Sequence, residues 1–252
     1  MIEYKVCPVC ESADFKPRLK VGDLNMLLQW TDKLPKEMTW CKCSACGHEF
    51  TKHYWENDEL MSLVNQHYGE QGSQPLSMYR MWAHGLFDKL DSDERIWGEN
   101  AWLDWGFGDG ALLGALKEHG VDCMGFEISQ TCLDAAKKAG LPVTHTLERD
   151  ETYQVVTCLD VLEHQPFPRK LIERLACHVA PRGRLVISTP RRDCHAFEAC
   201  GDGNPYYSEL EHHHVFSAGG LKDMLAEAKF AIESYHASSR YLFGMMVVAR
   251  RA

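Results

Sequence analysis

Leu103-Asp104-Trp105-Gly106-Phe107-Gly108-Asp109-Gly110 runs from an apolar segment into three glycines that alternate with other residues. A stretch with the apolar periodicity of a helix begins directly after it. The glycines Gly106 and Gly108 allow a tight turn and let a ligand approach the backbone closely. The pattern therefore predicts a strand, a turn and a helix that together cradle a ligand.

The acidic residues near this turn indicate what kind of ligand it holds. Glu127 ends the next apolar segment, where its carboxylate can accept hydrogen bonds from both hydroxyls of a ribose. Asp104 precedes the first glycine, and Asp109 lies between the second and the third. Carboxylates would repel a pyrophosphate, whereas they suit a positively charged ligand. A nucleoside that carries an ammonium and a sulfonium, such as S-adenosylmethionine (AdoMet), fits this description.

Apolar strand-like and helix-like segments alternate from residue 101 to the end of the chain. The expected strands are 101–105, 121–126, 142–146, 153–159, 184–189, 230–235 and 241–249, and the expected helices are 110–119, 130–139, 168–179 and 218–228. Such alternation predicts an α/β fold with a seven-stranded, Rossmann-like, mostly parallel sheet. The last two strands are too close in sequence for a crossover helix, so the last strand should be antiparallel.

Two further motifs give the sequence a family resemblance. Asp104-x-Gly106-x-Gly108-x-Gly110 resembles the first motif of class I AdoMet-dependent methyltransferases, and 157–164 is similar to the Leu-x-x-Val-Leu-Glu-His signature of the ubiquinone-biosynthesis type of small-molecule methyltransferases. The segment 181–190 resembles the turn and fifth strand of that group. The resemblance implies AdoMet as cofactor, bound by Asp104, Gly106, Gly108, Gly110, Glu127, Ile128, Leu159 and Asp160.

The N-terminal segment contains two Cys-x-x-Cys pairs, Cys7 with Cys10 and Cys43 with Cys46. Four thiolates in two tight turns can complete a closed tetrahedral Zn²⁺ site, which would be structural. Cys41, His48 and His53 are competing ligands. Free thiols are the alternative, while a redox pair is disfavoured because neither pair opens a helix after a strand.

The chain is therefore expected to have three parts. Residues 1–53 would form the zinc-binding module, 54–98 a helical lid or linker, and 99–252 the AdoMet-dependent methyltransferase domain. In the middle part, Tyr68, Tyr79 and Trp82 either line the pocket or pack inside a helix pair.

The segment Glu211-His212-His213-His214-Val215-Phe216-Ser217 should lie on the acceptor side. Its pattern Glu-His-x-x-x-Phe-Ser is similar to that of sugar C-methyltransferases, which implies that His212 helps to remove a proton from the acceptor, with Glu211 as its orienting partner. His164 is a second candidate base. That group has a tyrosine where this chain has Glu209, so methylation of carbon, oxygen or nitrogen stays open. Three adjacent histidines point in different directions, which disfavours a shared metal ion; plain loop histidines are the other interpretation.

Composition narrows the class of partner. The net charge of −9 disfavours binding to phosphate backbones, so we expect a small-molecule acceptor rather than a nucleic acid. A sugar or another secondary metabolite is an example of such an acceptor. The sequence lacks a signal peptide pattern and an apolar stretch long enough for a membrane, so we expect a cytoplasmic monomer or homodimer. An RNA or protein methyltransferase is the enzymatic alternative. A degenerate fold acting as an interaction module is the third, against which the intact glycine motif argues.

Overall fold

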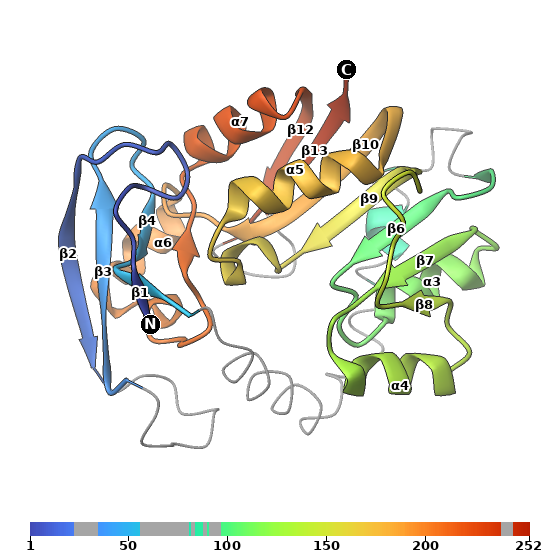
Figure 1. Ribbon diagram of the computed structural model, residues 1–252, viewed down its shortest axis with the longest axis horizontal. Coiled ribbons are helices and arrows are strands. Elements are labelled where there is room, and N and C mark those ends of the chain that lie inside the picture. Colours follow the sequence, from blue (N-terminus) through green and yellow to red (C-terminus); the bar gives the residue numbers. More distant parts are fainter. Residues whose placement is uncertain (23–34, 56–80, 82–83, 88–89, 91–96, 238–243) are drawn as a thin grey trace.

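The protein is represented by a computed structural model that describes residues 1–22, 35–55, 81, 84–87, 90, 97–237 and 244–252. Two groups of strands lie side by side in Figure 1: a small N-terminal group, drawn in blue, and a larger sheet that runs through the rest of the chain. Among the helices that the structure describes, none is long and apolar enough to cross a membrane.

The larger sheet has seven strands in the order β12-β13-β10-β9-β6-β7-β8. These strands are β6 (Trp102–Trp105), β7 (Cys123–Phe126), β8 (Val143–Thr144), β9 (Tyr153–Leu159), β10 (Val179–Pro190), β12 (Phe230–Ala237) and β13 (Gly244–Arg251). Strand β13 is antiparallel to both of its neighbours, and the pairs from β10 to β8 are parallel. The predicted fold class, including the antiparallel last strand, is confirmed.

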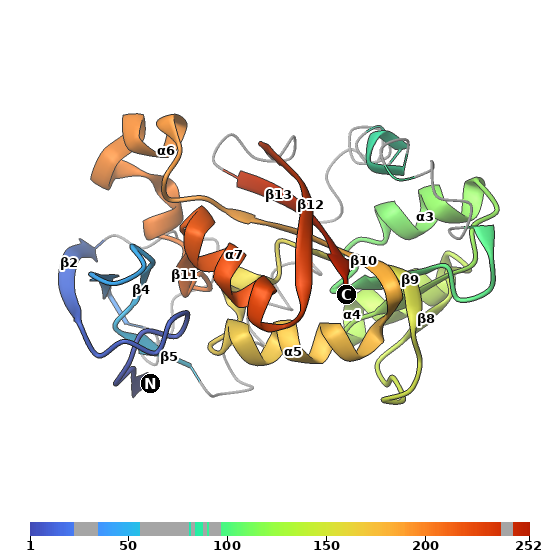
Figure 2. The same cartoon turned by 90° about the horizontal axis from the view of Figure 1, so that it is seen from above.

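Helices cover both faces of this sheet because successive strand residues point to opposite sides. These helices are α3 (Ala111–Glu118), α4 (Gln130–Lys138), α5 (Pro168–His178) and α7 (Ala218–Glu227). Helix α6 (His195–Cys200) packs elsewhere, through Phe197, in a cluster with Trp40 of the N-terminal strands. In β6, the side chain of Trp102 packs with α3 and α4, whereas Leu103 belongs to the cluster that contains α5 and α7. Figure 2 shows α5 running along the sheet on the side of α7.

Local sequence explains where several of these helices begin. The Ser129 hydroxyl accepts a hydrogen bond from the N–H of Cys132 at the start of α4, and Ser217 caps α7 in the same way. Pro168 occupies the first turn of α5, where its fixed φ suits the helix and its missing N–H costs nothing.

The N-terminal group is an antiparallel sheet in the order β11-β4-β3-β2. Its strands are β2 (Phe15–Gly22), β3 (Glu37–Cys43), β4 (Glu49–Thr51) and β11 (His214–Val215), and a separate pair joins β1 (Ile2–Glu3) to β5 (His53–Tyr54). Strand β11 follows β10 in the chain, so the N-terminal sheet takes one strand from the C-terminal half. The three predicted parts of the chain stay a prediction, and this shared strand links the first of them to the third.

Most of the predicted lid or linker, 54–98, lies outside the described residues, and so do Tyr68, Tyr79 and Trp82. Of its described residues, Leu86, Phe87 and Leu90 are buried against the apolar side of α3. This part of the segment therefore packs onto the seven-stranded sheet.

Candidate cofactor and acceptor sites

The turn after β6 has the backbone that its glycines predict. Gly106, Gly108 and Gly110 have φ values of +75°, +56° and +75°. Residues other than glycine rarely adopt such positive values. A Cβ atom at Gly106 would lie 2.5 Å from Cγ2 of Val161, so the turn also packs too closely for alanine. A Cβ at Gly108 would meet nothing within 4 Å, because this exposed glycine faces open space. Gly108 is thus the point where a ligand can approach the backbone.

Glu127 joins the turn after β6 to the turn after β7. Its Oε1 accepts hydrogen bonds from the N–H groups of Ile128 at 2.7 Å and Ser129 at 3.0 Å, and its Oε2 accepts one from Gly108 at 3.3 Å. Ile128 beside it is 58% exposed, which is unusual for an isoleucine. A ribose and an apolar adenine face match these two side chains.

Two aspartates lie at the carboxyl ends of neighbouring strands. Asp104, at the end of β6, is buried, and its Oδ1 accepts a 2.7 Å hydrogen bond from the Thr157 hydroxyl. Asp160 follows Leu159 at the end of β9, with a φ of 57°, and its Oδ1 accepts a hydrogen bond from Ser188 at 3.0 Å. Ligands of open α/β sheets bind at this edge, so the predicted cofactor residues lie where that rule requires.

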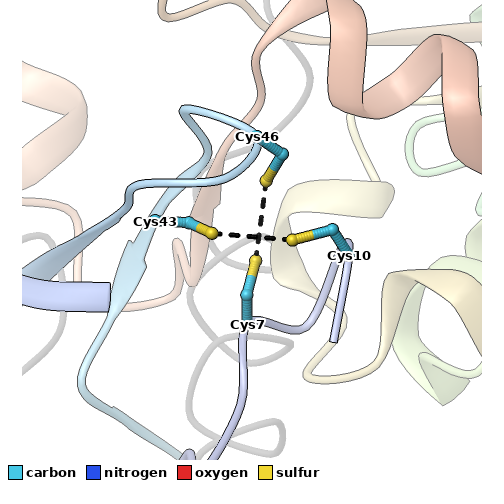
Figure 3. Close-up of side chains that lie close together, drawn as sticks. All are labelled: Cys7, Cys10, Cys43 and Cys46. Carbon is cyan, nitrogen blue, oxygen red and sulfur yellow. Dashed lines mark hydrogen bonds between the residues drawn. The ribbon is translucent and has the colours of Figure 1, made fainter. Parts of the chain in front are cut away.

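The four predicted zinc ligands come together in the N-terminal sheet (Figure 3). Their sulfur atoms all lie within 4.8 Å of one another, with 3.7 Å between Cys7 and Cys46 and 3.5 Å between Cys10 and Cys43. A tetrahedral site with Zn–S bonds of about 2.3 Å has sulfur atoms about 3.8 Å apart. The spacing fits a Cys₄ zinc site and is too long for a disulfide.

Both cysteine pairs are folded in the same way. The N–H of Glu11 donates to the carbonyl of Cys7 at 2.9 Å, and that of Gly47 donates to the carbonyl of Cys43 at 3.0 Å. Glu11 and Gly47 both have positive φ, as the residue that closes such a turn requires. The Cys46 sulfur and burial raise the pKa of the Cys7 thiol, burial raises that of Cys10 to about 11, and the Cys7 thiol lowers that of Cys46 to about 5. Neighbouring backbone N–H groups act to lower the pKa at all three sulfurs. The backbone is therefore suited to hold a cation among these sulfurs.

The competing ligands have other surroundings. Cys41 is a buried member of β3 that pairs with Phe50 of β4, and His53 belongs to β5. His48 is fully buried, and its Nε2 lies 3.1 Å from Nδ1 of His214.

The three adjacent histidines have three different partners. His212 Nδ1 lies 3.1 Å from Oε2 of Glu209, His213 Nδ1 lies 3.3 Å from the Thr51 hydroxyl, and His214 Nε2 lies 2.8 Å from the carbonyl of Gln165. Their ring nitrogens therefore do not converge on one ion. Each ring instead fixes a separate contact.

His212 and His164 lie against each other, with ring centroids 4.8 Å apart. The other face of His212 stacks on Tyr206 at 5.0 Å, and His164 Nδ1 lies 3.2 Å from the carbonyl of Glu211. Burial lowers the pKa of both His164 and His212, so both rings are neutral near pH 7 and are able to accept a proton. The carboxylate beside His212 is that of Glu209; Glu211 offers its backbone carbonyl to His164.

Two glutamates near these rings hold protons unusually tightly. Burial, and secondarily the charge of Glu211, raises the pKa of Glu209 to about 7. Since His212 is neutral, the 3.1 Å approach of Glu209 Oε2 to His212 Nδ1 is not an ion pair, and this ring nitrogen makes no hydrogen bond among the described residues. Burial and the charge of Asp160 also raise the pKa of Glu163, whose Oε2 accepts a 3.0 Å hydrogen bond from the Thr189 hydroxyl. The ligand atoms of Glu163, His164 and His212 lie within 4.8 Å of one another, so three groups that can bind a proton meet here.

Comparison with known families identifies the fold that carries these residues. A family model described as a methyltransferase domain matches residues 80–235. The chain belongs to this methyltransferase domain family. The resemblance to class I AdoMet-dependent methyltransferases, stated above from the sequence motifs, is confirmed.

The methyltransferase domain has relatives of known function and structure. It is 32% identical over 106 residues to a ubiquinone biosynthesis O-methyltransferase of Coxiella burnetii (38% of this chain, 45% of that protein), and 30% identical over 120 residues to one of Aliivibrio fischeri (43% and 51%). The matches thus span about half the length of these curated relatives. Magnesium protoporphyrin IX methyltransferase from Synechocystis PCC 6803, solved with bound S-adenosylhomocysteine, has the same fold, with a TM-score of 0.60, 17% identity, and coverage of 76% of this chain and 100% of that chain.

Two residues that contact the histidine segment 211–217 were not singled out for this contact by the sequence analysis. The sequence analysis named Glu209 only because it stands where sugar C-methyltransferases have a tyrosine. It named His48 only as a competing metal ligand. The partner of His48 is 166 residues away, so no local pattern announces their contact. The one signal that the sequence offers is the place of His48, two residues after the last cysteine of the second pair.

Proposed function

We propose that this protein is an AdoMet-dependent methyltransferase that acts on a small molecule. The observation that carries the proposal is the pairing of the positive-φ glycine turn after β6 with Glu127 after β7. When bound, AdoMet supplies an electrophilic methyl group on a sulfonium. Glu127 would accept the ribose hydroxyls, Ile128 and Leu159 would contact the adenine, and Asp104 and Asp160 would offset the positive charges of the ligand.

The chemistry on the acceptor side is proton removal. A neutral imidazole, His212 or its neighbour His164, would accept the proton of an acceptor hydroxyl as that oxygen takes the methyl group that bound AdoMet would supply. S-adenosylhomocysteine and the methylated acceptor leave. Fixing the two reactants in line supplies most of the acceleration, on the order of 7–11 kcal/mol. We propose that the ring is oriented by Glu209, whose Oε2 lies 3.1 Å from Nδ1 of His212, rather than by Glu211.

The acceptor class follows from charge and likeness. The relatives named above act in ubiquinone biosynthesis, and the 211–217 segment resembles that of sugar methyltransferases, so a hydroxylated small molecule such as a sugar or secondary metabolite is proposed. The net charge of −9 argues against a nucleic acid.

Calorimetry with S-adenosylhomocysteine tests the cofactor assignment. Replacement Glu127→Ala should weaken binding about 10- to 100-fold, because hydrogen bonds to a charged group contribute roughly 1.5–3 kcal/mol. Glu173→Ala removes an exposed carboxylate of α5 and should leave binding unchanged. Wild-type protein that binds no S-adenosylhomocysteine would rule the proposal out.

We also propose that Cys7, Cys10, Cys43 and Cys46 bind a structural Zn²⁺ ion. The support is the sulfur spacing and the backbone donors described above. Metal analysis should find about one zinc per chain, lost in Cys43→Ser but retained in Cys41→Ser, which changes a buried cysteine of the same strand. Equal zinc content in both variants would contradict the assignment.

A further inference from the structure

The residues after the second cysteine pair hold the segment 211–217 by its backbone. Strand β4 pairs with β11, so that Phe50 faces His214 and Glu49 faces Val215. The N–H of Thr51 donates to the carbonyl of His213 at 3.0 Å. At the far end of the segment, the Ser217 hydroxyl donates to the carbonyl of Cys46 at 2.8 Å, so the backbone of a proposed zinc ligand is itself a partner.

Side chains make a second connection, centred on His48. Its Nε2 lies 3.1 Å from Nδ1 of His214, and Nε2 of His214 lies 2.8 Å from the carbonyl of Gln165. The His48 ring is stacked on Phe50, at 5.7 Å and 9°, and lies 4.8 Å from the ring of Phe216. His48, His214 and both phenylalanines are fully buried, so these contacts exclude water and a lost hydrogen bond there cannot be replaced.

The opposite side of the segment contacts the turn after β9. The N–H of His213 donates to the carbonyl of Glu163 at 2.9 Å, and His164 Nδ1 lies 3.2 Å from the carbonyl of Glu211. The segment is therefore clamped between the cysteine pair at 43–46 and the residues at 163–165. The clamp determines where the His212 ring lies relative to His164.

The cofactor side is built from other contacts. The hydrogen bonds of Glu127 run to Gly108, Ile128 and Ser129, all in the turns of the parallel sheet. The turn at Gly106 packs on Val161.

We infer that the zinc site is the positioning element of the acceptor side, acting through His48 and His214, and that metal loss releases residues 211–217 while the cofactor side keeps its shape. The inference rests on the proposed function and on the proposed zinc ligation. His48 is a positioning residue: it touches neither reacting group, and it fixes strand β11, which begins two residues after His212.

Hydrogen exchange of the full-length protein, measured by mass spectrometry with and without a zinc chelator, tests this inference. Metal removal should accelerate exchange in peptides covering 211–217 at least about tenfold. The dissociation constant of S-adenosylhomocysteine, measured on the same samples, should change less than about threefold. Unchanged exchange in 211–217, or a loss of S-adenosylhomocysteine binding that parallels zinc loss, would overturn the inference. Absent binding in zinc-loaded protein would instead reject the proposed function.

Two substitutions at position 48 separate positioning from folding. His48→Phe keeps the aromatic packing but removes the bond to His214, and His48→Gln offers an amide near the position of Nε2. Both should retain zinc. Exchange in 211–217 should rise about three- to tenfold in His48→Phe and return toward the wild-type rate in His48→Gln. Wild-type exchange in His48→Phe, or the same increase in both variants, would show that His48 does not position the segment.

Discussion

The proposed cofactor side and the proposed acceptor side of this methyltransferase are held together by contacts at very different sequence distances. Glu127 binds the N–H of Gly108 across 19 residues, and the three glycines lie within a single turn. His48 meets His214 across 166 residues, and Tyr207 meets Glu49 across 158. The cofactor side therefore depends on a backbone conformation that neighbouring residues determine. The acceptor side depends on contacts between segments that are distant in the sequence.

The comparison also separates two kinds of energetic dependence. Adding a Cβ atom destabilises a turn with positive φ, whereas removing one partner destabilises a buried polar contact. Each of the following four experiments perturbs one of the two sides or compares them.

The largest effect is expected at Glu49, the anchor of the acceptor side. This fully buried carboxylate accepts hydrogen bonds from Arg192 at 2.8 Å and from the Tyr207 hydroxyl at 2.5 Å, and it lies 3.0 Å from Nε of Arg18. Glu49→Ala should lower the free energy of unfolding by about 3–5 kcal/mol, because it removes a buried carboxylate and leaves the partly buried guanidinium of Arg192 and the buried Tyr207 hydroxyl without their partner. Denaturant titration measures this.

A matched control for Glu49 lies on the neighbouring strand. Glu37 pairs with Lys20 on the exposed surface, so Glu37→Ala should cost at most about 1 kcal/mol. Similar losses in both variants would show that the long-range pairing at Glu49 carries no special weight.

The cofactor side should respond next most strongly, at Gly106. The Gly106→Ala substitution should destabilise the fold by about 2–4 kcal/mol, through a positive φ and the 2.5 Å approach to Val161. Adding Val161→Ala removes the clash but keeps the backbone strain, so a double-mutant cycle should recover part of the loss. Additive effects would mean that the two residues do not compete for the same space.

Acidity gives the third test, on the acceptor side. Because the pKa of Glu209 is raised from 4.5 to about 7, the folded state binds more protons than the unfolded state between these values. The stability contributed by this group is therefore lost as pH rises from about 4.5 to 7. Glu209→Gln stays neutral, so its stability relative to wild type should improve by about 2 kcal/mol between pH 5 and 8, allowing for partial exposure.

Thermal unfolding at several pH values provides the measurement for Glu209. Glu173→Gln, which changes an exposed carboxylate of α5, is the control variant. A flat difference for Glu209→Gln over this range would contradict the raised pKa.

The smallest expected difference compares two serines with the same local role. Ser129 caps α4 on the cofactor side, and Ser217 caps α7 on the acceptor side. Ser217 also donates to the carbonyl of Cys46. Ser129→Ala should cost about 1 kcal/mol, and Ser217→Ala should cost about 1 kcal/mol more, because it loses a second hydrogen bond. Equal losses would indicate that the bond to Cys46 adds no stability.

Prediction from the sequence succeeded where the structure of a segment depends on residues within that segment. The alternation of β6, α3, β7 and α4 follows from apolar periodicity, a Ser129 cap and glycines, each of which acts over a few residues. The two cysteine pairs were matched to each other because tetrahedral coordination needs four sulfurs and each pair supplies two in one turn.

Prediction fell short between β10 and α7. The sequence analysis expected a loop there, and the structure has α6, two short 3-10 helices, η3 (Gly201–Gly203) and η4 (Pro205–Tyr207), and strand β11. The two residues of β11 have no strand pattern of their own, since their hydrogen bonds are made with β4. The carboxylate that lies beside the His212 ring likewise belongs to Glu209, three residues before it, and not to its neighbour Glu211.

The sequence by itself determined the parallel sheet, the glycine turn with its carboxylate, and the pairing of cysteines, because these depend on periodicity, φ and ligand geometry within short segments. The tertiary structure alone decided that the N-terminal sheet is completed by β11 and that His48 supports His214. Those contacts form when segments that are distant in the sequence pack together. A buried polar group then needs a hydrogen-bond partner, and the local sequence pattern does not indicate which residue will supply it.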